Sequence, residues 1–303
     1  MKIAVLGAGS VGSYYGAVLK NKGFDVTLIC RGEHLKQISS NGLSVKSNWG
    51  DYNLNINATN DLIDIGFFDI IFYTPKLYSN KDTIPILKEI SNEKTLVITI
   101  QNGVNSFNEI GKFIDKKNII PAATFIEAEI ESPGVILQQG STAIIEMGEL
   151  DNSNSKRLKK ICEDFDSKLL HFKISKNILS TLWEKMIIVG AFGTIMTSFR
   201  MSFRELIDSN HGEKILRETM NEILSVGLYE GINLSSVNID QIIIDLKKEA
   251  DEMTASMFND LKNKKPLEID SILGHVVELS IKHDLYLPHS TTLVSSLEKF
   301  KKG

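Results

Sequence analysis

Three glycines near the start of the chain have the spacing of a dinucleotide-binding loop. The segment KIAVLGAGSVGSYYG sets Gly7, Gly9 and Gly12 in the pattern G-x-G-x-x-G, directly after the apolar run Lys2–Leu6. In such a loop the first glycine permits a tight turn, the second lets the backbone approach a pyrophosphate, and the third lets a helix pack on the strand. A strand before the motif and a helix after it favour this interpretation over a plain glycine-rich turn. The expected cofactor contacts are Gly7, Ala8, Gly9, Ser10, Val11 and Gly12.

The residue that follows the second apolar run indicates which dinucleotide is bound. An acidic side chain there binds the ribose 2′-hydroxyl of NAD, whereas an arginine suits the 2′-phosphate of NADP. The run Val26–Ile29 leads to Arg31, while Asp25 precedes the run and Glu33 comes two residues late. We therefore expect NADP(H), the alternative being a solvent-facing arginine in a loop.

Two more polar residues follow apolar runs at expected strand ends. Lys76 comes after FFDIIFYTP, and Asn102 comes after KTLVITIQ. Because ligands bind at the carboxyl ends of the strands of an open parallel sheet, both side chains would meet the glycine loop and Arg31 at one edge. Taken singly, Lys76 could be a surface lysine and Asn102-Gly103 an ordinary turn. Their shared location favours a role in binding.

Lys185 is the charged residue at the start of the most apolar stretch of the chain. The stretch TLWEKMIIVGAFGTIMTSFR has no further charge until Arg200, and Thr181 with Glu184 matches the capping box T-x-x-E. This predicts a buried helix with Lys185 in its first turns, where burial and the helix dipole both lower the pKa of an ammonium group. The residues alone fit either a proton-transfer lysine or a lysine whose stem packs on the core while its head reaches water.

The histidines offer no better acid than Lys185. They form no metal-ligand spacing, and none lies beside an acidic residue at an expected strand end: His34, His171, His211, His275, His283 and His289. We expect no metal site and interpret these histidines as surface or core residues. Reduction of a carbonyl by NADPH needs an acid that protonates the oxygen, and Lys185 is the better candidate.

The pattern of elements predicts two domains of different class. Residues 1–172 alternate apolar runs with helical segments and finish in hairpin-like β segments broken by Pro133-Gly134, which is typical of a Rossmann-type domain. Residues 173–303 show helical periodicity: the apolar stretch, a helix stopped by Gly231, and two C-terminal helices, the last opened by Pro288. The predicted fold class is α/β, with an N-terminal Rossmann-type dinucleotide-binding domain (1–172) and an all-helical C-terminal domain (173–303).

Composition limits the partners that we expect. With 42% hydrophobic and 24% charged residues, a net charge of −4 and scattered lysines, the chain should be soluble and globular and should bind neither nucleic acid nor an acidic membrane. The run Met186–Phe199 is shorter than the roughly 18–20 residues of a bilayer span. Cys30 and Cys162 match no zinc or disulfide pattern, and the start MKIAVLGAGS does not read as an export signal, so we expect the cytoplasm. The oligomeric state stays open, a homodimer being one alternative.

Motifs spread over nearly the whole chain carry a family resemblance. They are VLGAGSVGSYYG, Arg31, Lys76, QNG at 101–103, LWEKM around Lys185, TASMFNDL at 254–261 and LEIDSILG at 267–274. On these residues the chain resembles the ketopantoate reductase family, the NADPH-dependent 2-dehydropantoate 2-reductases of pantothenate synthesis.

The resemblance implies a role for each matching residue. The implied roles are catalysis by Lys185 and Glu268, with Lys185 as the proton donor, substrate binding by Asn102 and Ser256, and cofactor binding by Arg31, Lys76, Asn102 and Glu268. Glu268 also has an alternative explanation. It lies just after Pro266, and an acidic residue in the first turn of a helix is stabilising without any catalytic task.

Three positions depart from the family pattern. Typical members carry asparagines one and two helical turns after the lysine and a third further on, where this chain has Val189, Gly193 and Phe203. Valine and glycine side chains supply none of the donors and acceptors of an amide. We expect NADPH-dependent reduction of 2-dehydropantoate to pantoate. The alternatives are a divergent paralogue that reduces a less polar 2-oxo acid or ketone, and a non-catalytic NADP(H)-binding regulatory protein.

Overall fold

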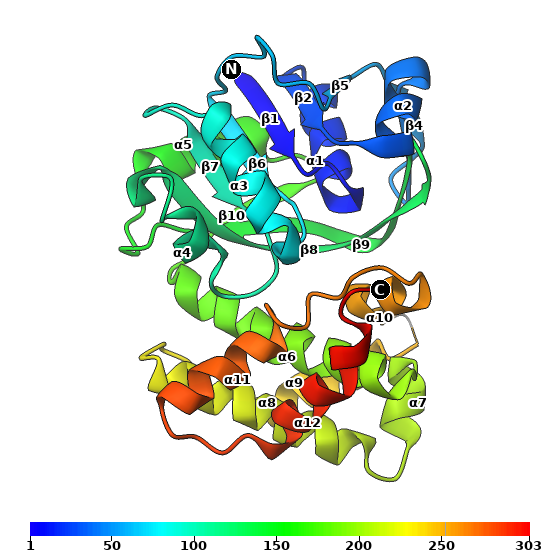
Figure 1. Cartoon of the computed structure of the whole chain (residues 1–303), viewed down its shortest axis with the longest axis vertical. Helices are drawn as coiled ribbons and strands as arrows, with labels where there is room; N and C mark the ends of the chain where they lie inside the picture. The colour runs from blue at the N-terminus through cyan, green and yellow to red at the C-terminus, as the bar shows by residue number, and fades with distance from the viewer. Residues whose placement is uncertain (252) are drawn as a thin grey trace. The chain divides into compact units, whose positions relative to one another are not determined.

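The chain forms two compact units of different class. A computed structural model describes residues 1–251 and 253–303, and it divides between Ile178 and Leu179 (Figure 1). The first unit, Met1–Ile178, is built on a sheet, whereas the described residues of the second, Leu179–Gly303, form helices and no strand. The predicted α/β class, with a Rossmann-type domain first and a helical domain second, is confirmed.

The first unit has a ten-stranded sheet in the order β4-β3-β9-β8-β7-β6-β1-β2-β5, with β10 paired to β9. The strands are β1 (Lys2–Leu6), β2 (Asp25–Ile29), β3 (Leu43–Ser47), β4 (Tyr52–Leu54), β5 (Asn57–Thr59), β6 (Ile70–Tyr73), β7 (Leu96–Thr99), β8 (Ile119–Ser132), β9 (Val135–Met147) and β10 (His171–Ile174). From β5 to β8 all neighbours are parallel, and β8 and β9 form the antiparallel hairpin expected around Pro133-Gly134. The parallel run therefore brings the carboxyl ends of β1, β2, β6 and β7 to one edge.

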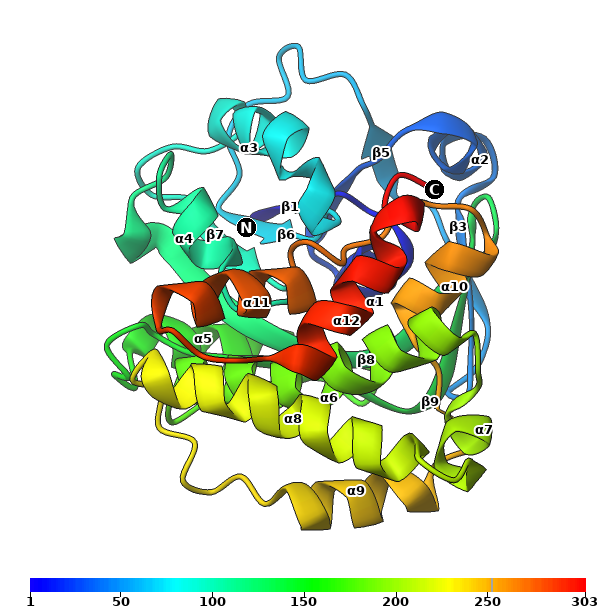
Figure 2. The same cartoon turned by 60° about the horizontal axis from the view of Figure 1, so that its bottom comes forward.

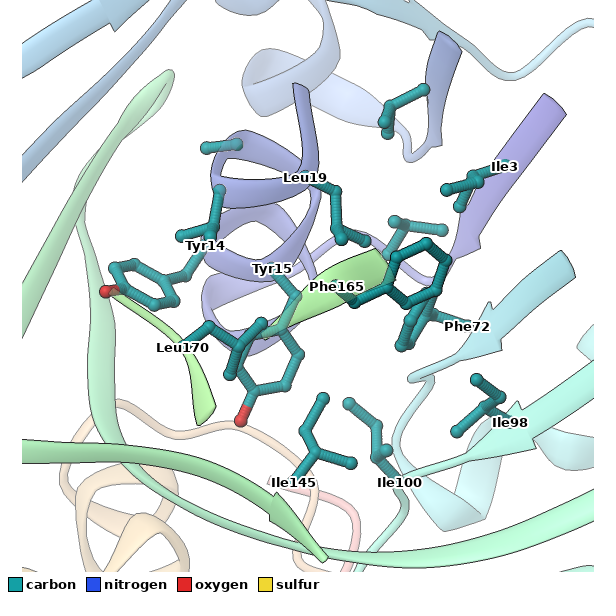
Figure 3. Packing of buried hydrophobic residues seen from close by; sticks show 14 of the residues in the cluster. Ile3, Tyr14, Tyr15, Leu19, Phe72, Ile98, Ile100, Ile145, Phe165 and Leu170 are labelled. Carbon is teal, nitrogen blue, oxygen red and sulfur yellow. The ribbon is translucent and has the colours of Figure 1, made fainter. Parts of the chain in front are cut away.

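Helices cover this sheet and complete its core. They are α1 (Ser10–Asn21), α2 (Gly32–Asn41), α3 (Asn80–Glu89), α4 (Ser106–Ile110) and α5 (Lys156–Phe165), with short 3-10 turns at Leu77–Ser79 and Lys116–Asn118. β1, β6 and β7 are apolar along almost their whole length, as expected for parallel strands buried on both faces. Figure 3 shows Tyr15 and Leu19 of α1 in one cluster with Phe72 of β6 and Phe165 of α5, all fully buried. Packing on this core fixes α1, and with it the glycine loop at its start.

The second unit is a helical array. Its helices are α6 (Ile178–Phe199, whose first residue belongs to the first unit), α7 (Phe203–Asp208), α8 (Gly212–Tyr229), α9 (Ile239–Lys248), α10 (Ser256–Lys262), α11 (Leu273–Lys282) and α12 (Pro288–Leu297), followed by a 3-10 turn at Glu298–Phe300. α8 contacts α7, α9, α11 and α12, and Figure 2 shows α9 alongside it. Gly231 follows α8 with a φ of 78°, and Pro288 opens α12, so both boundary predictions are confirmed. The sequence interpretation missed the shorter helices α7, α9 and α10.

α6 starts earlier than its capping-box pattern predicts. The helix begins at Ile178, so Thr181 lies inside it and the proposed cap at Thr181 is wrong. Ile178 is fully buried and packs so closely on Gly148 that a Cβ at that glycine would lie 2.7 Å from it. The helix therefore starts at a buried residue that packs on the loop after β9.

α6 is also long and apolar enough, by length and composition, to cross a membrane. Of its most apolar 18-residue window, 67% is buried within the described structure. The core helix of a soluble protein passes the same test, so α6 is weak support for a membrane span.

Candidate active site

The glycine loop joins β1 to α1 against the segment that follows β6. Gly7 has a φ of 84°, and a Cβ there would lie 2.6 Å from the backbone nitrogen of Pro75. A Cβ at Gly12 would lie 2.5 Å from Oγ1 of Thr74. At Gly9, by contrast, a Cβ would meet only the carbonyl oxygen of Gly7, at 3.8 Å. Gly7 and Gly12 are thus required by packing within the protein, while Gly9 leaves room for a ligand.

The N-terminus of α1 suits a phosphate group. Gly9 is the N-cap of α1 and supplies no side-chain cap, and Ser10, Val11 and Gly12 form the first turn, where backbone N–H groups have no acceptor within the helix. The dipole of the helix favours an anion at this end. The space at Gly9 and the donors of α1 fit the pyrophosphate of a dinucleotide.

Arg31 lies at the carboxyl end of β2, where it is the exposed N-cap of α2. The two acidic residues nearby do not replace it. Asp25 is the first residue of β2, at the opposite end, so that strand starts one residue earlier than predicted. Glu33 forms an exposed ion pair with Lys36 at 2.6 Å. Arg31 is thus the exposed charged residue that most closely follows β2, whereas Glu33 is paired with Lys36.

Lys76 and Asn102 follow β6 and β7 on loops that a buried glutamine ties together. Gln101 is 6% exposed, and its Nε2 donates to the carbonyl of Pro75 at 2.8 Å and to Oδ1 of Asn80 at 2.7 Å. Lys76 and Asn102 are half-buried on either side of this tie. The strand-end residues expected to converge therefore lie on neighbouring loops at the edge that carries the glycine loop.

Two residues that position these loops were given no role in the sequence analysis. Oγ1 of Thr74 donates to the carbonyls of Leu6 and Gly7, at 3.0 and 2.8 Å, and so fixes the start of the glycine loop. Gln101 makes the tie described above. Both are polar residues next to expected site residues at strand ends, which is the signal that could have identified them.

Lys185 is the lysine of the helical unit whose pKa is shifted from its ordinary value. It lies about two turns inside α6, beyond the first turn where the helix dipole acts. The residue keeps some exposed surface, yet burial of its ammonium group lowers the pKa of Lys185 to about 8, and the charge of Glu268 opposes that shift. Burial, and not the helix dipole, therefore brings the pKa of Lys185 closer to neutral pH.

Glu268 lies in the irregular segment before α11. It is 5% exposed, and α11 begins only at Leu273, so the alternative of an acidic residue in the first turn of a helix is wrong. The carbonyl of Glu268 accepts the N–H groups of Ser271 and Ile272, at 3.1 and 3.0 Å. Glu268 is therefore a buried acid close enough to Lys185 for its charge to raise the pKa of the lysine.

The face of α6 that carries Lys185 continues through Val189 to Gly193. Val189 is half-buried, and a Cβ at Gly193 would meet only Cβ of Ala255, at 3.8 Å. Ser256, the exposed first residue of α10, follows Ala255 directly, so Gly193 faces the segment that carries Ser256. A Cβ at this position would therefore make only an ordinary van der Waals contact.

Phe203, the third position that departs from the family pattern, lies outside α6. It is fully buried at the start of α7 and makes an edge contact with Phe192, with 6.0 Å between ring centroids.

Among residues 1–251 and 253–303, no group of three or more His, Cys, Asp or Glu side chains is arranged to hold a metal ion.

Comparison with known proteins relates both units to one family. The family profile described as "Ketopantoate reductase PanE/ApbA" matches residues 3–152, and "Ketopantoate reductase PanE/ApbA C terminal" matches residues 177–301. A 2-dehydropantoate 2-reductase of Pyrococcus horikoshii is 30% identical over 279 residues, which are 92% of this chain and 90% of that protein. An uncharacterized oxidoreductase of Bacillus subtilis, YkpB, is 25% identical over 304 residues, 99% of each chain. A solved complex of D-mandelate dehydrogenase with NADH has a TM-score of 0.88 and 25% identity, covering 99% of each chain.

Proposed function

The chain belongs to the ketopantoate reductase family, and from that premise we propose that it reduces 2-dehydropantoate (ketopantoate) to pantoate with NADPH. Members of this family are oxidoreductases that reduce a ketone with a nicotinamide cofactor. Our proposal adds the identity of the dinucleotide, the identity of the 2-oxo acid and the residues that act on them.

The cofactor in this proposal is NADPH, which supplies a hydride to the carbonyl carbon when bound. The glycine loop from Gly7 to Gly12 would hold the pyrophosphate at the start of α1. Arg31 would pair with the 2′-phosphate, because an exposed guanidinium at the carboxyl end of β2 can bind phosphate oxygens through two N–H groups. Lys76 and Asn102 would contact the cofactor from the neighbouring loops.

The observation that carries the proposed chemistry is the lowered pKa of Lys185, about 8, beside the buried Glu268. An acid with a pKa near the working pH is protonated enough to donate and acidic enough to lose its proton readily. Lys185 would donate a proton to the carbonyl oxygen as the alcohol forms. Glu268 would keep the lysine protonated and positioned, and Asn102 and Ser256 would orient the substrate.

A second candidate substrate is a less polar 2-oxo acid or ketone. The face of α6 after Lys185 presents Val189 and Gly193, which offer no side-chain hydrogen bonds. A site that lacks such groups loses its preference for a polar ligand. The similarity to a protein named D-mandelate dehydrogenase supports substrates with an apolar group.

The proposal extends to setting and assembly. A role in pantothenate and coenzyme A synthesis follows if ketopantoate is the substrate. The two free cysteines, Cys30 and Cys162, suit the cytoplasm. A homodimer is the assembly to test, by size-exclusion chromatography with light scattering.

The test is NADPH oxidation, followed by absorbance, with ketopantoate, phenylglyoxylate and a panel of other 2-oxo acids, each repeated with NADH. We expect the highest kcat/KM with ketopantoate and NADPH. A preference for phenylglyoxylate or another apolar oxo acid would replace ketopantoate by the second candidate, and equal use of NADH would overturn the role of Arg31.

A further inference from the structure

His34 links the glycine loop to two other segments of the first unit. It lies in the first turn of α2, three residues after Arg31. Its Nε2 is 3.1 Å from Oγ of Ser13 on α1, and its Nδ1 accepts the N–H of Gly134, in the turn between β8 and β9, at 3.0 Å. One imidazole ring therefore joins α1, α2 and the β8–β9 turn.

The hydrogen-bond partners determine where the proton of this ring lies. Because Nδ1 accepts the N–H of Gly134, the proton of the neutral ring is on Nε2 and is donated to Oγ of Ser13. The Ser13 hydroxyl, fully buried, then donates to the carbonyl of Ala8 at 3.1 Å. A continuous chain of hydrogen bonds thus runs from Gly134 through His34 and Ser13 to the glycine loop.

We propose that His34 is a positioning residue for the cofactor, because it holds the Ala8 carbonyl through Ser13 and anchors the start of α2, next to Arg31, to the turn at Gly134. This inference rests on the proposed binding of a nicotinamide dinucleotide by the glycine loop and Arg31. The arrangement requires a neutral ring, since a second proton on Nδ1 would face the N–H of Gly134.

The surroundings of His34 favour the neutral ring. Burial lowers the pKa of His34, and the positive end of the α2 dipole acts in the same direction. The charged groups on the helices and strands that meet at His34 are Arg31, Glu33 and Lys36 at the start of α2, Lys20 of α1, Lys46 of β3, Glu127, Glu129 and Glu131 of β8, and Glu146 of β9. Glu33–Lys36 and Glu131–Lys46 are ion pairs, both at 2.6 Å. Of the three residues that form the hydrogen-bond network, His34 is the one with a titratable side chain, and its pKa lies below the ordinary histidine value.

The sign of the pH effect follows from the lowered pKa. Above the ordinary histidine pKa of about 6.5 the ring is neutral and the network is complete. As the pH falls from about 6.5 through the lower pKa of folded His34, the ring takes up a proton, the bond from Gly134 is lost, and cofactor affinity should fall.

The experiment is isothermal titration of the full chain with NADP⁺, which is stable in acid, between pH 5.5 and 8. His34→Ala and Ser13→Ala should each raise the Kd at pH 8 by about threefold to tenfold, the value of one lost hydrogen bond. His171→Ala is the matched control, since His171 is an exposed histidine of the same unit that contacts Asp166, and its Kd should be unchanged.

His34→Gln separates positioning from general structural support. Glutamine can donate and accept but does not titrate in this range, so its Kd should have less pH dependence than that of the wild type. The cofactor 2′-phosphate also titrates near about pH 6, but it does so in both proteins and cancels in the comparison. This variant carries the test if His34→Ala does not fold.

The outcomes distinguish this inference from the proposed function. Wild-type protein that binds no NADP⁺ or NADPH would overturn both. Wild-type binding with unchanged Kd in His34→Ala and Ser13→Ala, or a His34→Gln profile parallel to the wild type, would overturn the positioning role alone.

Discussion

The start of α1 and the segment of α6 around Lys185 would recognise their proposed ligands by opposite means. At the start of α1 the proposed site depends on the backbone: Gly9 leaves space, and the donors are backbone N–H groups. On α6 the proposed chemistry depends on one side chain, Lys185, whose pKa is set by burial and by Glu268. A backbone site can accept only what its shape admits, whereas a side-chain site can change its ligand by a few substitutions. The cofactor class is therefore easier to infer than the substrate.

The largest effect should come from removing the proposed acid on α6. Lys185→Ala should lower kcat by about 10²–10⁴-fold, the usual contribution of a general acid. NADPH affinity should remain within about twofold, because the glycine loop belongs to the other unit. Stopped-flow turnover and fluorescence titration measure the two quantities. Lys185→Arg is the control for charge: it keeps a cation that does not release its proton and should be equally slow. Turnover close to wild type in either variant would refute the role of Lys185.

Within the glycine loop, substitutions of Gly9 and Gly12 should affect different properties: cofactor binding at Gly9 and stability at Gly12. Gly9→Ala should fold with an unchanged Tm but raise the Kd for NADPH by about 10- to 100-fold, because its Cβ would occupy ligand space and not protein space. Gly12→Ala should instead lower the Tm, since its Cβ would lie 2.5 Å from Oγ1 of Thr74. Thermal denaturation and cofactor titration of both variants separate the two cases. If Gly9→Ala binds NADPH with normal affinity, the pyrophosphate does not lie against Gly9.

Substitution of Arg31 tests whether the glycine loop prefers NADPH over NADH. Arg31→Ala should raise the KM for NADPH by about tenfold, because a charged hydrogen bond to phosphate is lost, and should leave the KM for NADH nearly unchanged. Steady-state kinetics with both cofactors give the ratio. Lys36→Ala, which removes an exposed cation of the same helix, is the control. An equal rise for both cofactors would contradict contact with the 2′-phosphate.

The smallest effect concerns the substrate face of α6. Gly193→Asn should raise kcat/KM for ketopantoate relative to phenylglyoxylate by about threefold to tenfold, the value of one added hydrogen bond. A Cβ at Gly193 fits without a clash, since it would meet only Cβ of Ala255, at 3.8 Å. Gly193→Ala adds the Cβ without the amide and should leave the ratio unchanged. A ratio that moves equally in both variants would mean that volume, and not hydrogen bonding, controls the choice.

The sequence predicts the first unit better than the second. Gly7, Gly9 and Gly12 fix a strand, a turn and a helix by local rules, and the loops that carry Lys76 and Asn102 follow from strand ends in a parallel sheet. In the second unit tertiary contacts decide more. α6 starts at the buried Ile178 and not after Thr181, and the segment around Glu268 stays irregular where a helix start was expected. The network of His34 joins residues about 100 positions apart, so no local pattern reveals it.

The most direct test of the account is the pH profile of kcat/KM for the 2-oxo acid at saturating NADPH. Since Lys185 must be protonated to act, the value should be constant at lower pH and fall as the pH rises through about 8. Glu268→Gln removes the charge that raises the pKa of Lys185, so its profile should break at a lower pH than that of the wild type. A profile that stays flat up to pH 10, or a break that moves upward in Glu268→Gln, would contradict Lys185 as the proton donor.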